Sequence, residues 1–266
     1  MQTTKWTAVR IAALKGSEKV VCLTAYDYTT ARLVDEAGLH MVLVGDSLAM
    51  TMLGHATTLP ATMDVMVGYT AAVTRGGKQA MVVADMPFLS YQVSTEQAVA
   101  NAGRFLQEAG ADGVKLEGGR FRADTIRTLV QNGIPVLGHI GLTPQSVRAT
   151  GGYKVQGRAE EDARRLQDDA QALAEAGVFA IVLECIPPDL AVAITQAVPM
   201  PTIGIGAGPG CDGQILVTHD MLGLSGATVP RFVKRYADLG ERMSAAFREY
   251  KSDVAAGCFP ADEHCY

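Results

Sequence analysis

Short runs of apolar residues recur along the chain, and most are followed by a segment with helical periodicity. Each run is only a few residues long, almost continuously apolar and rich in Val, Ile and Leu. A strand covered on both faces has this composition, so the runs predict buried parallel strands. We expect eight strands, at Val20–Ala25, Met41–Gly45, Ala80–Ala84, Gly113–Leu116, Val136–Ile140, Phe179–Leu183, Thr202–Ile205 and Ile215–Val217.

The segments between these strands are polar on one side and place Ala, Leu and Val three and four residues apart, as amphipathic helices do. Several end at Gly, which tolerates the left-handed conformation that terminates a helix. The clearest helices are expected at Thr29–Ala37, Thr95–Ala109, Arg122–Asn132 and Glu160–Ala176, with Thr95 as an N-cap.

Strands alternating with helices predict an α/β protein, a (β/α)8 TIM barrel. A doubly wound open sheet is the alternative, and it is less favoured because no GxGxxG motif follows the first strand. Thr3–Leu14 predicts an extra N-terminal helix, and Arg231–Gly257 predicts a C-terminal helical region with no strand after it. No low-complexity linker interrupts the chain, so residues 1–266 are expected to form a single barrel domain.

Composition excludes several classes of protein. The net charge of −5 argues against nucleic-acid binding, and the 48% of apolar residues allows a sizeable core. No apolar stretch reaches the roughly 18 residues of a membrane span, and no basic run followed by an apolar segment suggests a secretory signal. The five cysteines are scattered and form no CxxC pair, which favours reduced thiols without zinc. We therefore expect a cytoplasmic protein that binds neither nucleic acid nor membrane.

Ionisable residues stand at the ends of five predicted strands: Asp46, Asp85, Glu117, His139 and Glu184. In a parallel barrel these ends meet on one face, where active sites form. A single acid at a strand end is usually a helix cap or an ion-pair partner. Several carboxylates at one mouth repel one another unless a cation compensates their charge. Oxygen ligands without a Cys or His cluster favour Mg²⁺ or a similar hard cation.

Three of the ionisable residues leave more than one role open. Lys115 is two residues before Glu117 and shares its face of the strand, so it could pair with Glu117, bind a substrate carboxylate or enolate oxygen, or form a Schiff base. His139 could be a satisfied core residue or part of the site. Glu184 lies in apolar surroundings that could raise its pKa and suit a general base, or it could be a buried structural acid.

Glycine-containing loops follow several of the predicted strands. The segment Gly204–Gly210 follows the seventh strand, where barrels often bind phosphate, although simple tight turns are as consistent with it. The long loops containing Gly54-His55 and Gly151–Lys154 are typical of lids or substrate walls.

Several longer phrases are specific enough to indicate a family. They include LTAYDY at 23–28, VGDSL at 44–48, ADMPF at 84–88, VKLEGG at 114–119, GHIGLTPQ at 138–145 and GGYKVQG at 151–157. Through these phrases the chain resembles the ketopantoate hydroxymethyltransferase family from about residue 5 to its C-terminal end. Ala49 is a departure, because the family often has Gly after Asp-Ser-Leu.

The resemblance implies a (β/α)8 barrel that transfers a hydroxymethyl group to 3-methyl-2-oxobutanoate, giving ketopantoate in the first step of pantothenate biosynthesis. It implies one Mg²⁺ per subunit, 5,10-methylenetetrahydrofolate as the one-carbon donor, and a homo-oligomer, a decamer built as a pentamer of dimers. A carbon–carbon lyase of the phosphoenolpyruvate/pyruvate type is the rival enzyme, and a metabolite-binding protein on a decayed barrel is the non-catalytic rival.

The resemblance also implies roles for individual residues. Asp46 and Asp85 are implied as metal ligands with Glu117 in the metal sphere, and Glu184 as the proton acceptor. The expected keto-acid contacts are Asp46, Ser47, Asp85 and Lys115. His139 is added to them because it also lies at a strand end.

Overall fold

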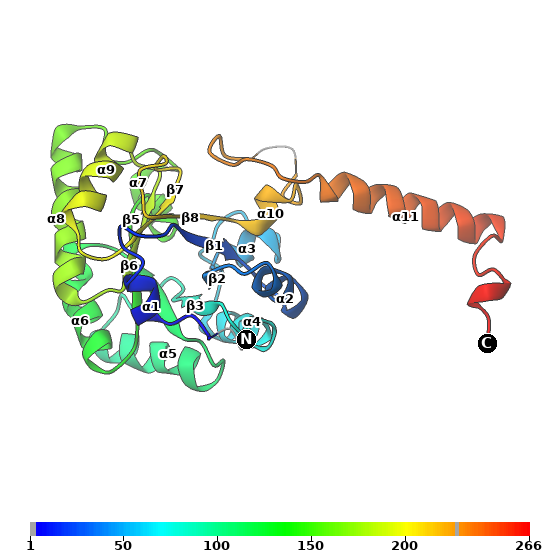
Figure 1. Ribbon diagram of the computed structural model, residues 1–266, viewed down its shortest axis with the longest axis horizontal. Coiled ribbons are helices and arrows are strands. Elements are labelled where there is room, and N and C mark those ends of the chain that lie inside the picture. Colours follow the sequence, from blue (N-terminus) through cyan, green and yellow to red (C-terminus); the bar gives the residue numbers. More distant parts are fainter. Residues whose placement is uncertain (1–3, 227–228) are drawn as a thin grey trace. The chain divides into compact units, whose positions relative to one another are not determined.

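Eight parallel strands close into a barrel in the computed structural model, which describes residues 4–226 and 229–266 (Figure 1). Each strand pairs with the next in the sequence, and β1 pairs with β8 to close the sheet. The predicted (β/α)8 TIM barrel is confirmed, and the open doubly wound sheet is excluded. The strands are β1 Val20–Thr24, β2 Met41–Val44, β3 Met81–Asp85, β4 Gly113–Glu117, β5 Val136–Gly141, β6 Ala180–Glu184, β7 Thr202–Ile205 and β8 Gly213–Leu216.

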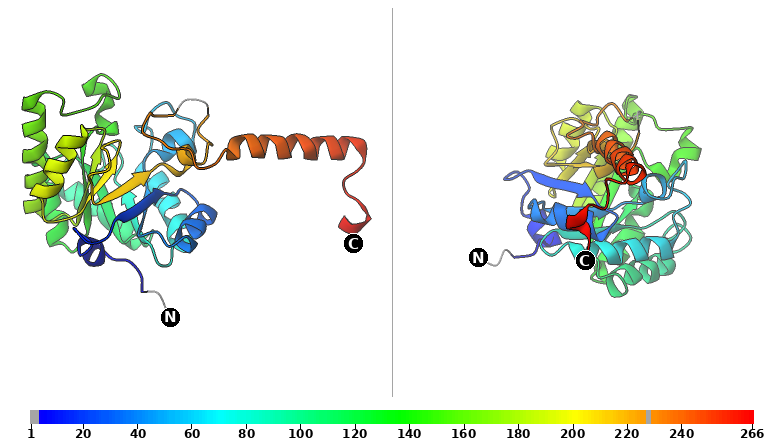
Figure 2. Two further views of the ribbon diagram at one scale, coloured as in Figure 1. Left: turned by 45° about the horizontal axis from the view of Figure 1, so that its top comes forward. Right: turned by 90° about the vertical axis from the view of Figure 1, so that its right-hand side faces the viewer.

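Helices surround the strands (Figure 2). The larger ones are α2 Tyr28–Glu36, α4 Met63–Gly76, α5 Thr95–Gln107, α6 Ala123–Gln131, α8 Glu160–Ala176 and α9 Pro188–Ala197. All four helices named from the sequence are confirmed, each to within two residues at either end. Two of these helices, α4 and α9, were not among those predicted from the sequence. One reason is that α9 begins directly after Pro187 and at Pro188, a pair that is also typical of a turn.

The N-cap of α5 was wrongly predicted by one residue. Ser94 has the extended backbone of a cap, and its hydroxyl accepts a hydrogen bond from the Gln97 N–H. Thr95 is the first residue of the helix, and its hydroxyl lies 3.2 Å from that of Thr125. Ser and Thr are both good caps, so the residue types alone could not decide between the two.

Two layers of core side chains lie on the two sides of the barrel wall. Residues such as Met41, Leu43 and Met81 belong to the cluster inside the barrel. Their neighbours Val42 and Val44 belong to the cluster between the strands and the helices. Side chains of a strand alternate between the two faces, so this division shows which residues of each strand point inward.

The short helix α1 (Ala8–Ala12) packs at the end of the barrel where the strands begin. Ile11 is fully buried in the inner cluster, and Trp6 packs against it. The Trp6 N–H donates to the carbonyl of Gln79, just before β3. Of the predicted N-terminal helix Thr3–Leu14, the structure has residues 8–12 as a helix and residues 4–7 and 13–14 outside it, and Thr3 lies outside the described residues. The opposite end of the barrel is left to polar side chains.

The chain divides into two compact units, Met1–Val217 with the barrel and Thr218–Tyr266. The second unit contains α10 (Thr218–Met221) and α11 (Leu239–Ala256), which lies inside the predicted region Arg231–Gly257 and has no buried residue. The single-domain expectation stays a prediction. No helix among the described residues is long and apolar enough to cross a membrane.

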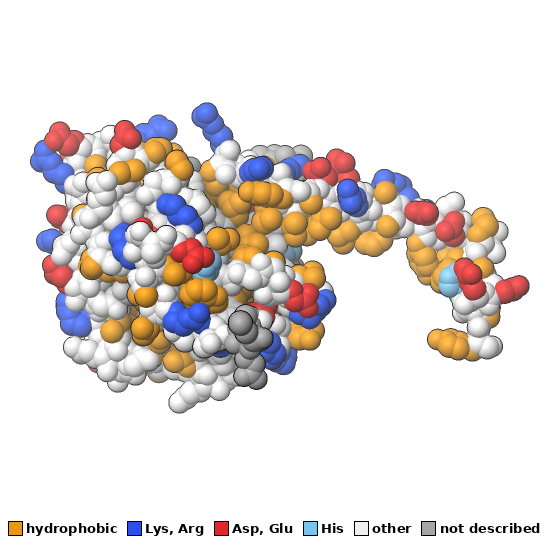
Figure 3. Space-filling model, in the orientation of Figure 1, with side chains coloured by type: hydrophobic (Ala, Val, Ile, Leu, Met, Phe, Trp, Pro, Cys, Tyr) orange, Lys and Arg blue, Asp and Glu red, His pale blue; other side chains and the backbone are white. Residues whose placement is uncertain are grey.

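The helix α11 carries a row of exposed apolar side chains (Figure 3). Met243, Phe247, Tyr250 and Val254 are all 46% exposed or more. Their spacing of four, three and four residues places them on one face of the helix. Beyond the helix, the Phe259 ring packs at 5.7 Å from that of Tyr250.

Candidate active site at the carboxyl ends of the strands

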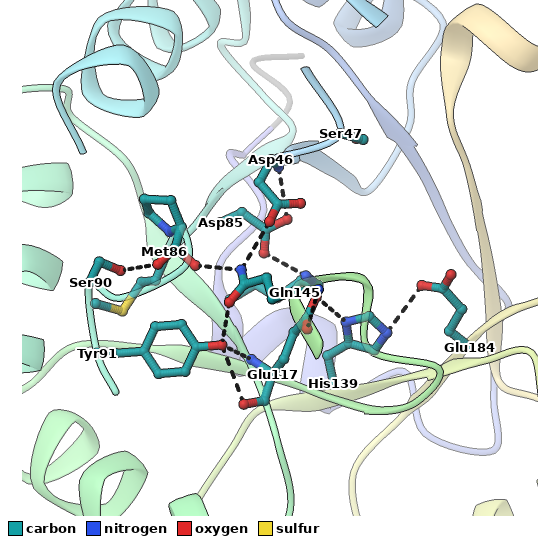
Figure 4. A network of polar contacts seen from close by, with 12 residues as sticks. Asp46, Ser47, Asp85, Met86, Ser90, Tyr91, Glu117, His139, Gln145 and Glu184 are labelled. Atoms are coloured by element: carbon teal, nitrogen blue, oxygen red, sulfur yellow. Dashed lines mark hydrogen bonds and ion pairs between the residues drawn. The ribbon is translucent and has the colours of Figure 1, made fainter. Parts of the chain in front are cut away.

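Where the strands end, ionisable side chains line the inner face of the barrel in place of apolar ones. In β3, Met81 and Val83 point inward, so Asp85 continues the same face. The same alternation turns Lys115 and Glu117 of β4 inward, and likewise His139 of β5 and Glu184 of β6. The strand register pairs Asp85 with Lys115 and Glu117 with His139. Together with Asp46, just beyond β2, these side chains gather at one mouth, where Figure 4 labels Asp46, Asp85, Glu117, His139 and Glu184. Lys115 lies against Asp85.

Lys115 forms an ion pair with Asp85. The Lys115 Nζ lies 2.5 Å from Asp85 Oδ1, and the two side chains are only 5% and 3% exposed. The other oxygen of Asp85 accepts a hydrogen bond from the Asp46 backbone N–H at 3.1 Å. Pairing of Lys115 with Glu117, one of the options left open by the sequence, is not what the structure shows.

Negative charge exceeds positive charge among these buried groups. Burial and then the neighbouring charge of Asp85 raise the pKa of Asp46 to about 7, against the opposing effect of Lys115. Burial also raises the pKa of Glu117 well above its usual range. Burial alone would lower the pKa of Lys115, but the charges of Asp85, Glu117 and Asp46 outweigh it and raise that pKa, so the amine stays protonated. The positive charge of Lys115 therefore offsets the negative charges of Asp85, Glu117 and Asp46 together.

His139 lies between two carboxylates. Its Nε2 is 3.2 Å from Glu184 Oε2, and its Nδ1 is 3.7 Å from Glu117 Oε1. Burial, and then the charge of Lys115, lowers the pKa of His139 well below its usual range, so the imidazole is neutral. His139 belongs to the polar site and is not enclosed only by apolar side chains.

Glu184 is the acid of this cluster that remains partly open to solvent. Its side chain is 16% exposed, whereas that of His139 beside it is 2% exposed. Burial raises the pKa of Glu184 to about 7, although Lys115 opposes the shift. A carboxyl that titrates near neutrality and lies at the open side of the site can take a proton from a bound molecule.

Ser47 begins the turn into α3 (Leu48–Thr51) and lies apart from the carboxylate network (Figure 4). Its hydroxyl is 2.8 Å from the Tyr26 hydroxyl. The chain can turn this closely because residue 45 is glycine, where a Cβ would come within 2.8 Å of Ser47 Oγ. The departure at Ala49 is a fully buried methyl group in the core.

Two uncharged residues of the site escaped the sequence analysis. Gln145 donates from its backbone N–H to Glu117 Oε2 at 3.1 Å and from Nε2 to Asp46 Oδ2 at 2.9 Å. Tyr91 donates its hydroxyl to Gln145 Oε1 at 2.7 Å. Gln145 ends the phrase GHIGLTPQ, which was noted only for its resemblance, and an amide in a loop does not signal chemistry by itself.

The glycine-containing loops form turns and walls. Gly206 and Gly208 both have positive φ, and the carbonyl of Gly208 accepts a hydrogen bond from Gln214 Nε2, which is a tight-turn arrangement. After β5, the hydroxyl of Tyr153 lies 3.8 Å from the sulfur of Met50 in α3. The loop after β5 thus meets the loop after β2 beside the mouth.

The carboxylates do not form a ready metal cage. Within the part of the chain that the structure describes, no three His, Cys, Asp or Glu side chains are grouped so that they could hold a metal ion by themselves. Asp46 and Asp85 are adjacent, and the buried Glu117 Oε1 has no hydrogen-bond partner among the described residues. The site could therefore supply two or three oxygen ligands to a cation whose other ligands come from water or substrate.

The fold occurs in other solved structures. A 2,3-dimethylmalate lyase of the PEP mutase/isocitrate lyase superfamily matches with a TM-score of 0.59 and 18% identity, over 97% of this chain and 91% of that one. A phosphonopyruvate hydrolase in complex with oxalate and Mg²⁺ matches with a TM-score of 0.58 and 18% identity, over 97% and 92% of the two chains. At this level of identity the likeness is one of fold alone.

Sequence comparison gives a closer relationship. The ketopantoate hydroxymethyltransferase family model matches residues 5–262. The 3-methyl-2-oxobutanoate hydroxymethyltransferase of Moorella thermoacetica is 54% identical over 266 residues, covering 100% of this chain and 99% of that protein. That of Syntrophomonas wolfei is 55% identical over 252 residues, covering 95% and 91%. The chain therefore belongs to the ketopantoate hydroxymethyltransferase family.

Proposed function

We propose that this enzyme transfers a hydroxymethyl group from 5,10-methylenetetrahydrofolate to 3-methyl-2-oxobutanoate, giving ketopantoate for pantothenate biosynthesis. The observation that carries the proposal is the buried cluster of Asp46, Asp85, Glu117 and Lys115 beside Glu184, in a chain of this family. Such a cluster suits a substrate that carries oxyanions and must lose a proton from carbon.

The residues present fit a divalent cation, and Mg²⁺ is the one we propose. Asp46 and Asp85 would be ligands, with Glu117 contributing its unpartnered Oε1 or holding a bound water. Burial and the neighbouring charge of Asp85 raise the pKa of Asp46, and a cation here would offset both effects by stabilising the ionised carboxylate. The related phosphonopyruvate hydrolase was crystallised with Mg²⁺ and oxalate. When bound, Mg²⁺ would polarise the keto oxygen and so acidify the proton on C3 of the keto acid.

The side chains divide the remaining work. Glu184 takes the proton from C3, because it is the acid nearest solvent and has a pKa of about 7. The protonated amine of Lys115 offsets the negative charge that develops on the substrate oxygens, and the neutral His139 lies beside Glu184, with its Nε2 3.2 Å from Glu184 Oε2. Ser47, Asp46 and Asp85 complete the keto-acid contacts. C3 then bonds to the methylene carbon of the folate as the bond from that carbon to one folate nitrogen breaks. Water replaces the remaining nitrogen and supplies the hydroxyl group, which releases ketopantoate and tetrahydrofolate.

A single set of assays tests this function. Ketopantoate formation is measured with Mg²⁺ present, with and without 5,10-methylenetetrahydrofolate, and again after treatment with EDTA. We expect product only when the folate is present, loss of product after chelation, and recovery when Mg²⁺ is returned. Cleavage of a phosphoenolpyruvate- or pyruvate-type substrate without folate would favour the lyase alternative. Full activity in EDTA would refute the metal role.

Activity is expected to fall as the pH drops through about 7. Glu184 must be ionised to accept a proton, and burial raises its pKa to about 7, so at lower pH the protonated and inactive form predominates. A glutamate with the usual pKa of about 4.3 would stay ionised, and so able to accept a proton, down to about that pH. The pH dependence of kcat/KM for C3 proton exchange measures the apparent pKa. A flat profile between pH 5 and pH 8 would contradict the assignment.

We also propose that the enzyme is a cytoplasmic homo-oligomer, a decamer arranged as a pentamer of dimers. The apolar face of α11 supports self-association, because Phe247 and Tyr250 are 64% and 60% exposed on a helix without a buried residue. Contiguous apolar surface of this kind usually marks a contact with another chain.

A further inference from the structure

A buried amide joins two of the carboxylates that serve the proposed cation. Gln145 lies in the 3-10 turn Pro144–Ser146 after β5 and is 4% exposed. Its Nε2 donates to Asp46 Oδ2 at 2.9 Å, and its backbone N–H donates to Glu117 Oε2 at 3.1 Å. One residue therefore contacts acids that come from the ends of β2 and β4 (Figure 4).

The surroundings of the Gln145 amide allow only one orientation. Besides Asp46, the Nε2 donates to the carbonyl oxygen of Met86 at 2.9 Å, and a carbonyl can only accept. On the other side, Oε1 accepts hydrogen bonds from the Tyr91 hydroxyl at 2.7 Å and from Gln92 Nε2 at 3.1 Å. Both hydrogens and both lone pairs of the amide are used, so a flipped amide would set acceptor against acceptor.

The hydrogen bonds run in one direction through this network. The backbone N–H of Glu117 donates to the Tyr91 hydroxyl at 3.1 Å, Tyr91 donates to Gln145, and Gln145 donates to Asp46. The series ends at the Asp46 carboxylate, which accepts the last of these hydrogen bonds. Buried polar networks whose members are all satisfied hold their groups rigidly.

We propose that Gln145 is a positioning residue for the divalent cation site. It holds the carboxylates of Asp46 and Glu117 in place before the ion binds. The inference rests on the proposed function, since it requires a cation at Asp46. Groups that orient metal ligands from behind typically change metal affinity by roughly 10- to 100-fold when they are removed. Gln145 has the burial and the two carboxylate contacts that this role needs.

The test measures metal binding without any turnover. Mn²⁺ is titrated into wild-type protein, Gln145→Met and Gln92→Met, and free Mn²⁺ is followed by its EPR signal. Methionine has nearly the shape of glutamine but lacks its side-chain hydrogen bonds, including the one to Asp46, whereas the backbone N–H that donates to Glu117 remains. Gln92→Met is the matched control, because Gln92 contacts the Gln145 Oε1 but donates to neither carboxylate. We expect Gln145→Met to weaken Mn²⁺ binding by roughly 10-fold or more and Gln92→Met to change it less than about twofold.

Each outcome separates the inference from the proposed function. If wild-type protein bound no Mn²⁺, the metal role and the inference would both fall. If wild type bound Mn²⁺ and folded Gln145→Met bound it equally well, or if Gln92→Met weakened binding as much, only the inference would fall. If Gln145→Met did not fold, as judged by circular dichroism, Tyr91→Phe takes its place. Unlike Gln92→Met, it removes both a donor to Gln145 Oε1 and the acceptor of the Glu117 backbone N–H, so it should weaken Mn²⁺ binding in the same direction, and unchanged affinity would overturn the inference.

Discussion

Replacing Glu184 by Gln is expected to slow exchange of the C3 proton of 3-methyl-2-oxobutanoate by about 10²- to 10⁴-fold, the usual contribution of a general base. Glutamine keeps the shape of the side chain but cannot accept the proton. His139, 3.2 Å from the Glu184 carboxylate, can still contact the amide, so the site should keep its geometry. Exchange is followed by NMR in deuterated water with Mg²⁺ and without folate, which isolates the proton transfer from the later bond formation.

A second glutamate beside a histidine supplies the control for this variant. Glu18 lies 3.4 Å from His40, near the start of β1 and thus toward the other end of the barrel. Glu18→Gln makes the same chemical change and should leave exchange unaltered. Normal exchange in Glu184→Gln would show that another group removes the proton. A loss of the same size in Glu18→Gln would show that the effect arises from the fold and not from the site.

The barrel could be predicted because its strands are covered on both faces. Such strands must be almost wholly apolar, so their positions are visible as short runs of Val, Ile and Leu. Helices were less visible where their polar and apolar faces are less distinct. The segment Met63–Gly76 of α4 contains four glycine or threonine residues, Gly68, Thr70, Thr74 and Gly76, which are poor helix formers, and packing against the barrel stabilises it.

The acids of the site could be predicted because the ends of parallel strands meet at one mouth, whatever the loops do. The partner of Lys115 could not, because it depends on strand register. Two residues along one strand are about 6.6 Å apart, whereas directly paired residues of neighbouring strands are about 4.8 Å apart. The register sets Asp85 opposite Lys115, so Asp85 pairs with the lysine and Glu117 does not.

Gln145 and Tyr91 show a different limit. Both lie in loops, and their contacts with Asp46 and Glu117 depend on how the chain runs after β3 and β5. Neutral polar side chains are common in loops, and no period or spacing distinguishes one that contacts a buried carboxylate. The hydrogen bonds of a folded structure are needed to find them.

Replacing Lys115 by Met is expected to lower the free energy of unfolding by about 3–5 kcal/mol, the usual cost of breaking a buried ion pair. The variant leaves Asp85 buried without its cation, beside the carboxylate of Asp46. Asp85→Asn should cost less, because Lys115 then keeps the favourable charges of Glu117 and Asp46. Unfolding in urea at pH 7, with EDTA in every sample so that no cation replaces the lysine, measures both.

The double variant Lys115→Met with Asp85→Asn decides whether the pair is the cause. Removing both partners leaves no unpaired charge between them, so the double variant should be more stable than the sum of the single losses predicts. Lys5→Met is the control, because the Lys5–Asp112 pair is 2.6 Å apart but 41% and 25% exposed, and such pairs contribute about 0–1 kcal/mol. A loss below about 1 kcal/mol in Lys115→Met, or strict additivity in the double variant, would contradict the argument. Such a result would show that the buried Lys115–Asp85 pair is not needed for stability. The role left for the Lys115 amine would then be its contact with the substrate.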